Sequence, residues 1–318
     1  LTLGMLVYSF LRELEGRRAL FRTFSLYLPP DRARQLARQP AGQAMAAENR
    51  ELSVMFCDLR GFTSVSEGLT PDALRELLNA YFSLATEVVH AHGGTLDKFI
   101  GDAVMAFWGA PLAQPDHARR AVQAALALAA SAEPLNAQLA SRGLPPVRFG
   151  IGVATGVVCV GDLGSQLRRS YTAVGDAVNL AARLEALTRE AGVAVLVDEP
   201  TRHACDGAAQ PWVWVEVDRC PIRGRQQPVT VFTPLPITAG SAVTLEAQVR
   251  TWHLAQALAR QHHAQQALAE LAPFLSPALT TILPAVPTPL VPPALATLAT
   301  RLAHRLGHDA EGSPCNPP

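Results

Sequence analysis

Apolar runs of strand length alternate with amphipathic helical segments between Arg50 and about Pro234, and this alternation restricts the possible folds more than any other feature. The longest helical segment has Thr70 as its N-cap, Pro71 in its first turn and Gly93 just past its end. The same patterns predict helices at 116–139 and 176–191, strands at 52–58, 95–100, 103–108, 193–199, 212–217 and 229–234, and a strand pair inside 148–164. Hairpins mixed with helices in this order predict an α+β fold and not a doubly wound sheet.

The two ends of the chain differ from this central region of residues 48–237. Residues 1–47 open with an apolar run of about 11 residues, short of the roughly 20 that span a bilayer. Residues 1–40 carry seven arginines against three acidic residues, a balance typical of the cytoplasmic side of a membrane helix. We expect the end of a transmembrane helix and a juxtamembrane linker helix here; the alternative is an amphipathic helix that packs on its own domain or on a partner. Residues 238–318 predict a helical C-terminal appendage with a Pro-rich stretch.

Charge and cysteine content limit the possible partners. The 27 basic residues balance the 27 acidic ones, so the chain lacks the basic field that nucleic acid requires and a small substrate is expected. The five cysteines form no CxxC pair and no metal spacing with histidine, which favours reduced thiols in a cytoplasmic domain.

Two carboxylates follow predicted strands. Asp58 ends the strand at 52–58, and Asp102 lies at the tip of the hairpin after Lys98. Each aspartate alone is compatible with an N-cap, but two carboxylates on neighbouring strands repel each other unless a cation lies between them. They are therefore candidate ligands for Mg²⁺ or Mn²⁺, and the loop from Leu59 through Phe62 to Thr63 offers backbone N–H groups to a phosphate.

A second candidate cluster lies on the helix that begins near Asp176. Asn179 and Arg183 are four residues apart, so they share a helix face and are able to reach one anionic ligand together. The alternative is ordinary surface pairing of Arg183 with Glu185 or Asp176. The run GIGVATG is not followed by an acidic residue at nucleotide-binding spacing, and the sequence contains neither a P-loop nor an HExxH motif.

Three runs taken together resemble one family. They are ELSVMFCDLRGFTSVSE, GGTLDKFIGDAVMAFWG and GIGVATGVVCVGDLGSQLRRSYTAVGDAVNLAARLE, and in order and spacing they resemble the class III adenylyl and guanylyl cyclases over about residues 48–235. The resemblance implies a ferredoxin-like βααββαβ core and a head-to-tail homodimer with active sites at its interface.

The resemblance also implies residue roles. Asp58 and Asp102, with Leu59 beside them, would hold two metal ions per site, Asn179 and Arg183 would orient the ribose and stabilise the phosphoryl transition state, and Lys98 and Thr172 would contact the base. Arg223 would contact the terminal phosphates, although lysine is common in the family at that place. The Lys/Thr pair resembles an adenylyl cyclase subgroup that includes bicarbonate-responsive members, and residues 27–40 resemble the link to a membrane-embedded sensor in bacterial receptors.

Lys98 is the only lysine of the chain, since the other 26 basic residues are arginines. Adenine presents an acceptor at N1 and a donor at its N6 amino group, and guanine presents the reverse. A donor-only ammonium suits adenine N1, whereas the Thr172 hydroxyl both donates and accepts and so discriminates poorly by itself. The expected reaction is conversion of ATP to 3′,5′-cyclic AMP and pyrophosphate; a guanylyl cyclase and a non-catalytic nucleotide-binding homologue remain as alternatives.

Overall fold

The computed structural model divides the chain into two compact units, one made of Leu1–Leu187 with Ala194–Gly207 and the other of Thr188–Val193 with Ala208–Pro318. The structure describes residues 5, 8, 15, 18, 21–25, 27–28, 30–36, 46–165, 169–207, 210–220, 228–237, 242–275 and 292–310.

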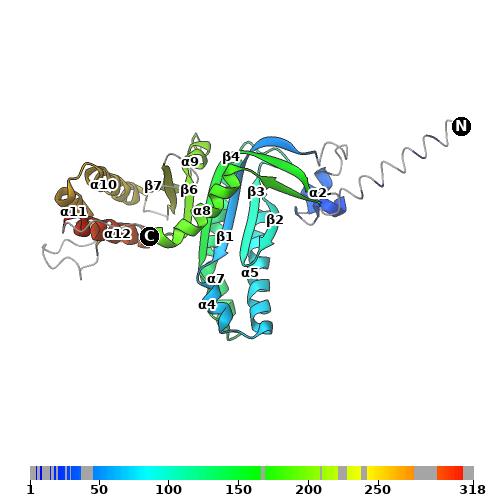
Figure 1. Ribbon diagram of the computed structural model, residues 1–318, viewed down its shortest axis with the longest axis horizontal. Helices are drawn as coiled ribbons and strands as arrows, with labels where there is room; N and C mark the ends of the chain where they lie inside the picture. The colour runs from blue at the N-terminus through cyan, green and yellow to red at the C-terminus, as the bar shows by residue number, and fades with distance from the viewer. Residues whose placement is uncertain are drawn as a thin grey trace. The chain divides into compact units, whose positions relative to one another are not determined.

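The first unit contains the predicted βααββαβ order. Its elements are α2 (Pro30–Leu36), β1 (Glu48–Leu59), α4 (Phe62–Glu67), α5 (Pro71–Ala91), β2 (Thr95–Ile100), β3 (Ala103–Trp108), α6 (His117–Ala130), α7 (Ala132–Ala140), β4 (Phe149–Gly164), β5 (Arg169–Val174), α8 (Asp176–Ala191), β6 (Val195–Asp198) and α9 (Glu199–Ala204). Its strands lie in the order β2-β3-β1-β4-β6, and β5 pairs with β4 (Figure 1). Only the β4–β6 pairing is parallel among the pairings given for these strands, so the predicted α+β fold with a mixed sheet is confirmed.

Helices pack on both faces of this sheet, and the alternation of side chains along β1 shows which helix lies where. On one face, the Tyr81 hydroxyl of α5 donates to the backbone carbonyl of Cys57 at 3.0 Å, and His117 of α6 hydrogen-bonds Ser53 at 2.8 Å. Residues at even positions of β1 face the other way. That face is covered by α8, which lies against Gly152 of β4, the residue paired with Phe56. Asp58 therefore lies on the α8 face.

One local expectation is wrong, and another, the helical stretch at 116–139, is confirmed in two parts. The stretch 148–164 is one long strand, β4, paired with β1 in unbroken register from Phe149 to Val160, and not a strand pair. Its glycines allow close packing and do not form a turn. The helical stretch 116–139 is divided at Ser131 into α6 and α7. Pro134 explains the division, because its ring conflicts with the carbonyl of Ala130 four residues earlier.

We expect Gly152→Ala to destabilise the protein, because α8 approaches β4 through backbone atoms at this point. A Cβ at Gly152 would lie 2.2 Å from the carbonyl oxygen of Ala181 and 2.3 Å from the amide nitrogen of Glu185. Neither atom is able to rotate away, so the helix must shift, and the free energy of unfolding should fall by about 1–3 kcal/mol in urea denaturation. Gly156→Ala is the matched control, since its Cβ would meet only the Ala177 side chain, at 3.3 Å. Equal unfolding midpoints for the two variants would contradict this packing.

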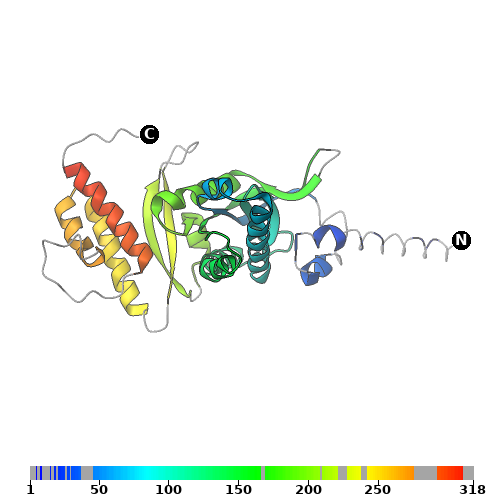
Figure 2. The ribbon, with the colours of Figure 1, turned by 90° about the horizontal axis from the view of Figure 1, so that it is seen from below.

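The second unit joins a strand pair to the C-terminal helices. Its elements are β7 (Trp212–Cys220), β8 (Val229–Pro236), α10 (Ala242–Arg260), α11 (Ala264–Leu271), the short 3₁₀ turn Ala272–Phe274 and α12 (Pro293–Ala310). The helices α10, α11 and α12 lie side by side (Figure 2). The Trp252 indole and the Gln256 amide of α10 donate to backbone carbonyls of β7 at 2.7 Å each. The predicted helical character of this region is thus confirmed for its described part, whereas the Pro-rich stretch lies largely outside the described residues.

In the part of the chain that the structure describes, no helix is both long enough and apolar enough to cross a membrane. The apolar run at residues 1–11 lies almost wholly outside that part, so the expected membrane helix stays a prediction.

Candidate active site

The predicted pair of carboxylates comes together. Strands β1 and β3 are antiparallel neighbours with Cys57 opposite Val104, so the end of β1 lies beside the turn that carries Asp102. Burial and the Asp102 carboxyl, which lies within hydrogen-bonding reach, raise the pKa of Asp58. Two carboxyl groups this close resist simultaneous ionisation, and a cation between them relieves the repulsion.

The backbone around Asp58 fixes the direction of its carboxylate. The amide of Leu59 donates to Asp58 Oδ1 at 2.9 Å, while the Leu59 side chain is buried. Only the backbone of Leu59 is thus available as a ligand. Phe62 and Thr63 form the first turn of α4, where backbone amides have no carbonyl partner within the helix.

Glu185 joins the carboxylate pair, whereas the sequence indicates for it only surface pairing with Arg183. Its charge contributes to raising the pKa of Asp58, and burial raises its own pKa to about 7 against the attraction of Arg60. The signal for this position was present in the sequence, because Glu185 follows Ala177 and Ala181 at intervals of four along the face of α8 that lies on β4.

These oxygen-donating residues fit a divalent cation of the Mg²⁺ type. Among the described residues, no group of three or more His, Cys, Asp or Glu side chains is arranged to hold a metal ion by itself. A cation held by Asp58 and Asp102 would therefore complete its coordination with backbone oxygen, water and the phosphate oxygens of a bound substrate. Mg²⁺ commonly binds in this way, with few protein ligands.

Asn179 and Arg183 do not share the side of α8 that faces the carboxylates. Arg183 and Glu185 are two residues apart, which corresponds to about 200° around a helix. Since Glu185 faces Asp58 and Asp102, Arg183 projects away from them in the same chain. Asn179, four residues before Arg183, is exposed on the same side as Arg183.

Lys98 and Thr172 come together around a third residue. The Thr172 hydroxyl donates to the Asp97 carboxylate at 2.5 Å, and the Lys98 ammonium lies 3.4 Å from the same carboxylate. The structure thus groups the predicted base-contacting residues in one cluster. Arg223 lies outside the described residues, so its role stays a prediction.

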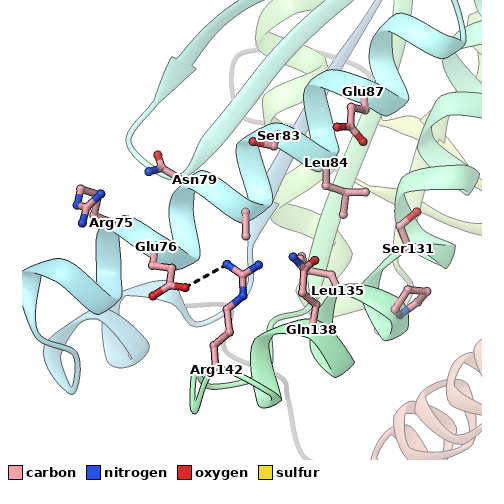
Figure 3. A pocket seen from close by; sticks show the side chains of 12 residues that line it. Arg75, Glu76, Asn79, Ser83, Leu84, Glu87, Ser131, Leu135, Gln138 and Arg142 are labelled. Carbon is pink, nitrogen blue, oxygen red and sulfur yellow. Dashed lines mark hydrogen bonds and ion pairs between the residues drawn. The ribbon is translucent and has the colours of Figure 1, made fainter.

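A hollow of about 630 Å³ lies elsewhere in this unit, between α5 and α7 (Figure 3). An ion pair of 3.0 Å between Glu76 and Arg142 joins its two sides. The hollow is lined by none of the predicted site residues, so it is distinct from the candidate active site.

Comparisons with known proteins agree with this arrangement. Residues 45–233 match the family described as the adenylate and guanylate cyclase catalytic domain. A curated relative, adenylate cyclase 1 of Rhizobium meliloti (strain 1021), is 41% identical over 181 residues, which are 57% of this chain and 27% of that protein. The chain therefore matches only about a quarter of that relative's length.

Solved structures of both base specificities are similar to the chain. The adenylyl cyclase CyaB from P. aeruginosa is 32% identical with a TM-score of 0.57, covering 61% of this chain and 98% of that one. The guanylyl cyclase Cya2 is 33% identical with a TM-score of 0.56, covering 62% and 98%. The match over residues 45–233, together with these structures, shows that the chain belongs to the adenylate and guanylate cyclase catalytic domain family.

Proposed function

We propose that the chain is the catalytic part of an adenylyl cyclase that converts ATP to 3′,5′-cyclic AMP and pyrophosphate. The observation that carries the choice of adenine is Lys98, whose half-exposed, donor-only ammonium lies beside Thr172 through their shared neighbour Asp97. In the reaction, the ribose 3′-oxygen forms a bond to the α-phosphorus, and the bond from that phosphorus to the bridging oxygen of pyrophosphate breaks. The proton of the 3′-hydroxyl passes to water or to the leaving pyrophosphate.

Each of the site residues has its own role in the proposed reaction. Asp58 and Asp102, with the Leu59 backbone, would hold Mg²⁺ or Mn²⁺, two ions per site. When bound, these ions lower the pKa of the 3′-hydroxyl and neutralise phosphate charge. Arg183 donates to the oxygens of the reacting phosphate and Asn179 orients the ribose, while the first-turn amides at Phe62 and Thr63 donate to the remaining phosphate oxygens.

The direction of Arg183 supports a site shared between two copies of the chain. In one protomer Arg183 projects away from Asp58 and Asp102, so it is badly placed to act on a nucleotide held by that same pair. A head-to-tail homodimer removes this difficulty. One protomer supplies the two aspartates, and its partner supplies Lys98, Thr172, Asn179 and Arg183, which gives two equivalent sites.

The proposal predicts cyclic AMP as the main product. The purified chain is incubated separately with ATP and GTP in Mn²⁺ and in Mg²⁺, and the cyclic nucleotide and pyrophosphate are quantified by chromatography. We expect both products in equal amounts from ATP, with kcat/KM for ATP well above that for GTP. Removal of the metal with a chelator should abolish the reaction. A preference for GTP would identify a guanylyl cyclase, and no product from either nucleotide would favour the non-catalytic homologue.

A further inference from the structure

The proposed reaction assigns no role to the carboxylate of Asp97. Among the charged groups beside Lys98 and Thr172, this carboxylate is the most deeply buried. Its side chain is 0% exposed. It accepts hydrogen bonds from the Thr172 hydroxyl and from the backbone amide of Ala173, and the Lys98 ammonium lies 3.4 Å from its Oδ1. Burial raises the pKa of Asp97, whereas the two hydrogen bonds and the nearby ammonium act in the opposite direction and favour the ionised carboxylate.

A β-bulge explains how neighbouring residues of one strand reach the same place. Consecutive side chains of a regular strand point to opposite faces. In β2, however, Leu96 pairs with Ala106 and Lys98 pairs with Met105, so Asp97 is the extra residue between them. The bulge turns Asp97 into the interior while the ammonium of Lys98 stays close to its carboxylate. Bulges of this kind often direct a side chain next to an active site.

Other parts of the fold close this position to water. Thr172 is buried in β5, and its neighbour Tyr171 packs edge-to-face on the buried Phe24 at 5.2 Å. The backbone of Tyr27 accepts from the amide of Leu96 at 3.0 Å. With water excluded, the carboxylate remains a strong and fixed acceptor for the Thr172 hydroxyl.

We propose that Asp97 is the positioning residue for base selection: by accepting the single hydrogen of the Thr172 hydroxyl, it leaves Thr172 able only to accept. The inference rests on the proposed function, in which Lys98 and Thr172 contact the base. A free threonine hydroxyl pairs with the N6 amino group of adenine or with O6 of guanine. A threonine whose hydrogen is held by a carboxylate accepts from N6 but cannot donate to O6. Asp97 thus turns a poorly discriminating residue into an adenine-selective one.

The test is Asp97→Asn, which keeps the shape of the side chain. With its amide oxygen toward the Lys98 ammonium, its NH2 group faces the Thr172 hydroxyl and donates to it, so that Thr172 is able to donate to a ligand. We expect the ratio of kcat/KM for ATP to that for GTP to fall by about 3- to 30-fold, since one hydrogen bond weakens for ATP and one becomes available for GTP. Asp97→Ala is the second variant if the asparagine variant does not fold, because it leaves no polar group to bury. It should lower the ratio in the same direction.

Two controls distinguish the positioning of Thr172 by Asp97 from a general effect of the lost charge on the ATP/GTP ratio. Asp162→Asn removes the same charge from β4, at the position paired with Tyr171, without touching Thr172, and its ratio should equal that of the unaltered chain. Thr172→Val should lower the ratio by itself, and adding Asp97→Asn to it should change the ratio no further, because Asp97 acts only through the lost hydroxyl. A full additional decrease in the double variant would overturn the proposal.

A binding measurement distinguishes this inference from the proposed function. The probes are 3′-deoxy-ATP and 3′-deoxy-GTP with Mn²⁺, which lack the attacking hydroxyl, and their Kd values are measured by calorimetry. If the chain yields no cyclic nucleotide but prefers 3′-deoxy-ATP, and Asp97→Asn reduces that preference, then the proposed function fails and the role of Asp97 stands. An unchanged preference in folded Asp97→Asn, or binding of neither probe, would overturn the role of Asp97.

Discussion

A mixture of Asp58→Ala and Arg183→Ala chains is expected to form cyclic AMP, although each variant alone is inactive. Asp58→Ala removes a metal ligand from one half of the shared site, and Arg183→Ala removes the phosphate contact from the other half. In a heterodimer both defects fall in one site, and the second site is intact. With random exchange in an equal mixture, half of the dimers are heterodimers, so activity should reach up to about a quarter of that of the unaltered chain.

The mixing experiment requires evidence of exchange and a matched negative control. Differently tagged chains are co-purified to confirm that heterodimers form, and product is then measured with ATP and Mn²⁺. A mixture of Asp58→Ala with Asp102→Ala should remain inactive, because both changes damage the same half and every site in the mixture lacks one aspartate. Confirmed exchange without recovery for the Asp58 and Arg183 pair would exclude a site shared in this way.

Lys98→Glu is expected to lower kcat/KM for ATP by roughly 30- to 1000-fold. The change places an acceptor opposite the acceptor N1 of adenine and removes a charged hydrogen bond, a combined cost of about 2–4 kcal/mol. Asp58 and Asp102 are untouched, so metal binding should persist. Use of GTP should rise relative to ATP, but only in part, because Thr172 remains unsuited to O6 of guanine. Adding Thr172→Cys should move the ratio further toward GTP.

The measurement is kcat/KM for both nucleotides in Mn²⁺, with Lys98→Gln as the control. Lys98→Glu also brings a second carboxylate toward buried Asp97, whose present charged neighbour is Lys98 at 3.4 Å. Glutamine removes the ammonium without adding that repulsion, and its amide both donates and accepts. It should therefore reduce ATP use less than glutamate does and favour neither base strongly. An unchanged ATP/GTP ratio in folded Lys98→Glu would show that Lys98 does not contact the base.

The elements that the sequence predicts well are those whose ends carry local chemical signals. The helix α5 begins after Thr70, whose hydroxyl accepts from the amide of Ala73 at 3.3 Å, and Gly93 follows its end with a φ of 73°. The long strand β4 was less predictable. Its glycines resemble a turn in the sequence, and only the tertiary approach of α8 shows that the missing side chains make room for a helix.

The candidate active site was predictable from the sequence only in part. Asp58 ends β1 and Asp102 lies in the turn of the β2–β3 hairpin, so the two aspartates meet once β3 pairs with β1. Asp97 was missed because its inward direction depends on a bulge, and a regular strand would direct Asp97 and Lys98 to opposite faces. Glu185 was missed because its role depends on how closely α8 packs on the sheet. Neither the bulge in β2 nor the close packing of α8 on the sheet is evident from a single sequence.

The half-exposed side chain of Lys98 also has a practical consequence. With 26 arginines and one lysine, the chain offers a single ε-amine to acylating reagents or to aldehydes with borohydride. That amine is 42% exposed and lies in the proposed base-binding cluster. A fluorophore or crosslinker attached there becomes a reporter at a defined place, with no cysteine introduced and none of the five native cysteines removed. Apart from its N-terminal α-amine, the chain thus has one amine for ordinary bioconjugation, that of Lys98.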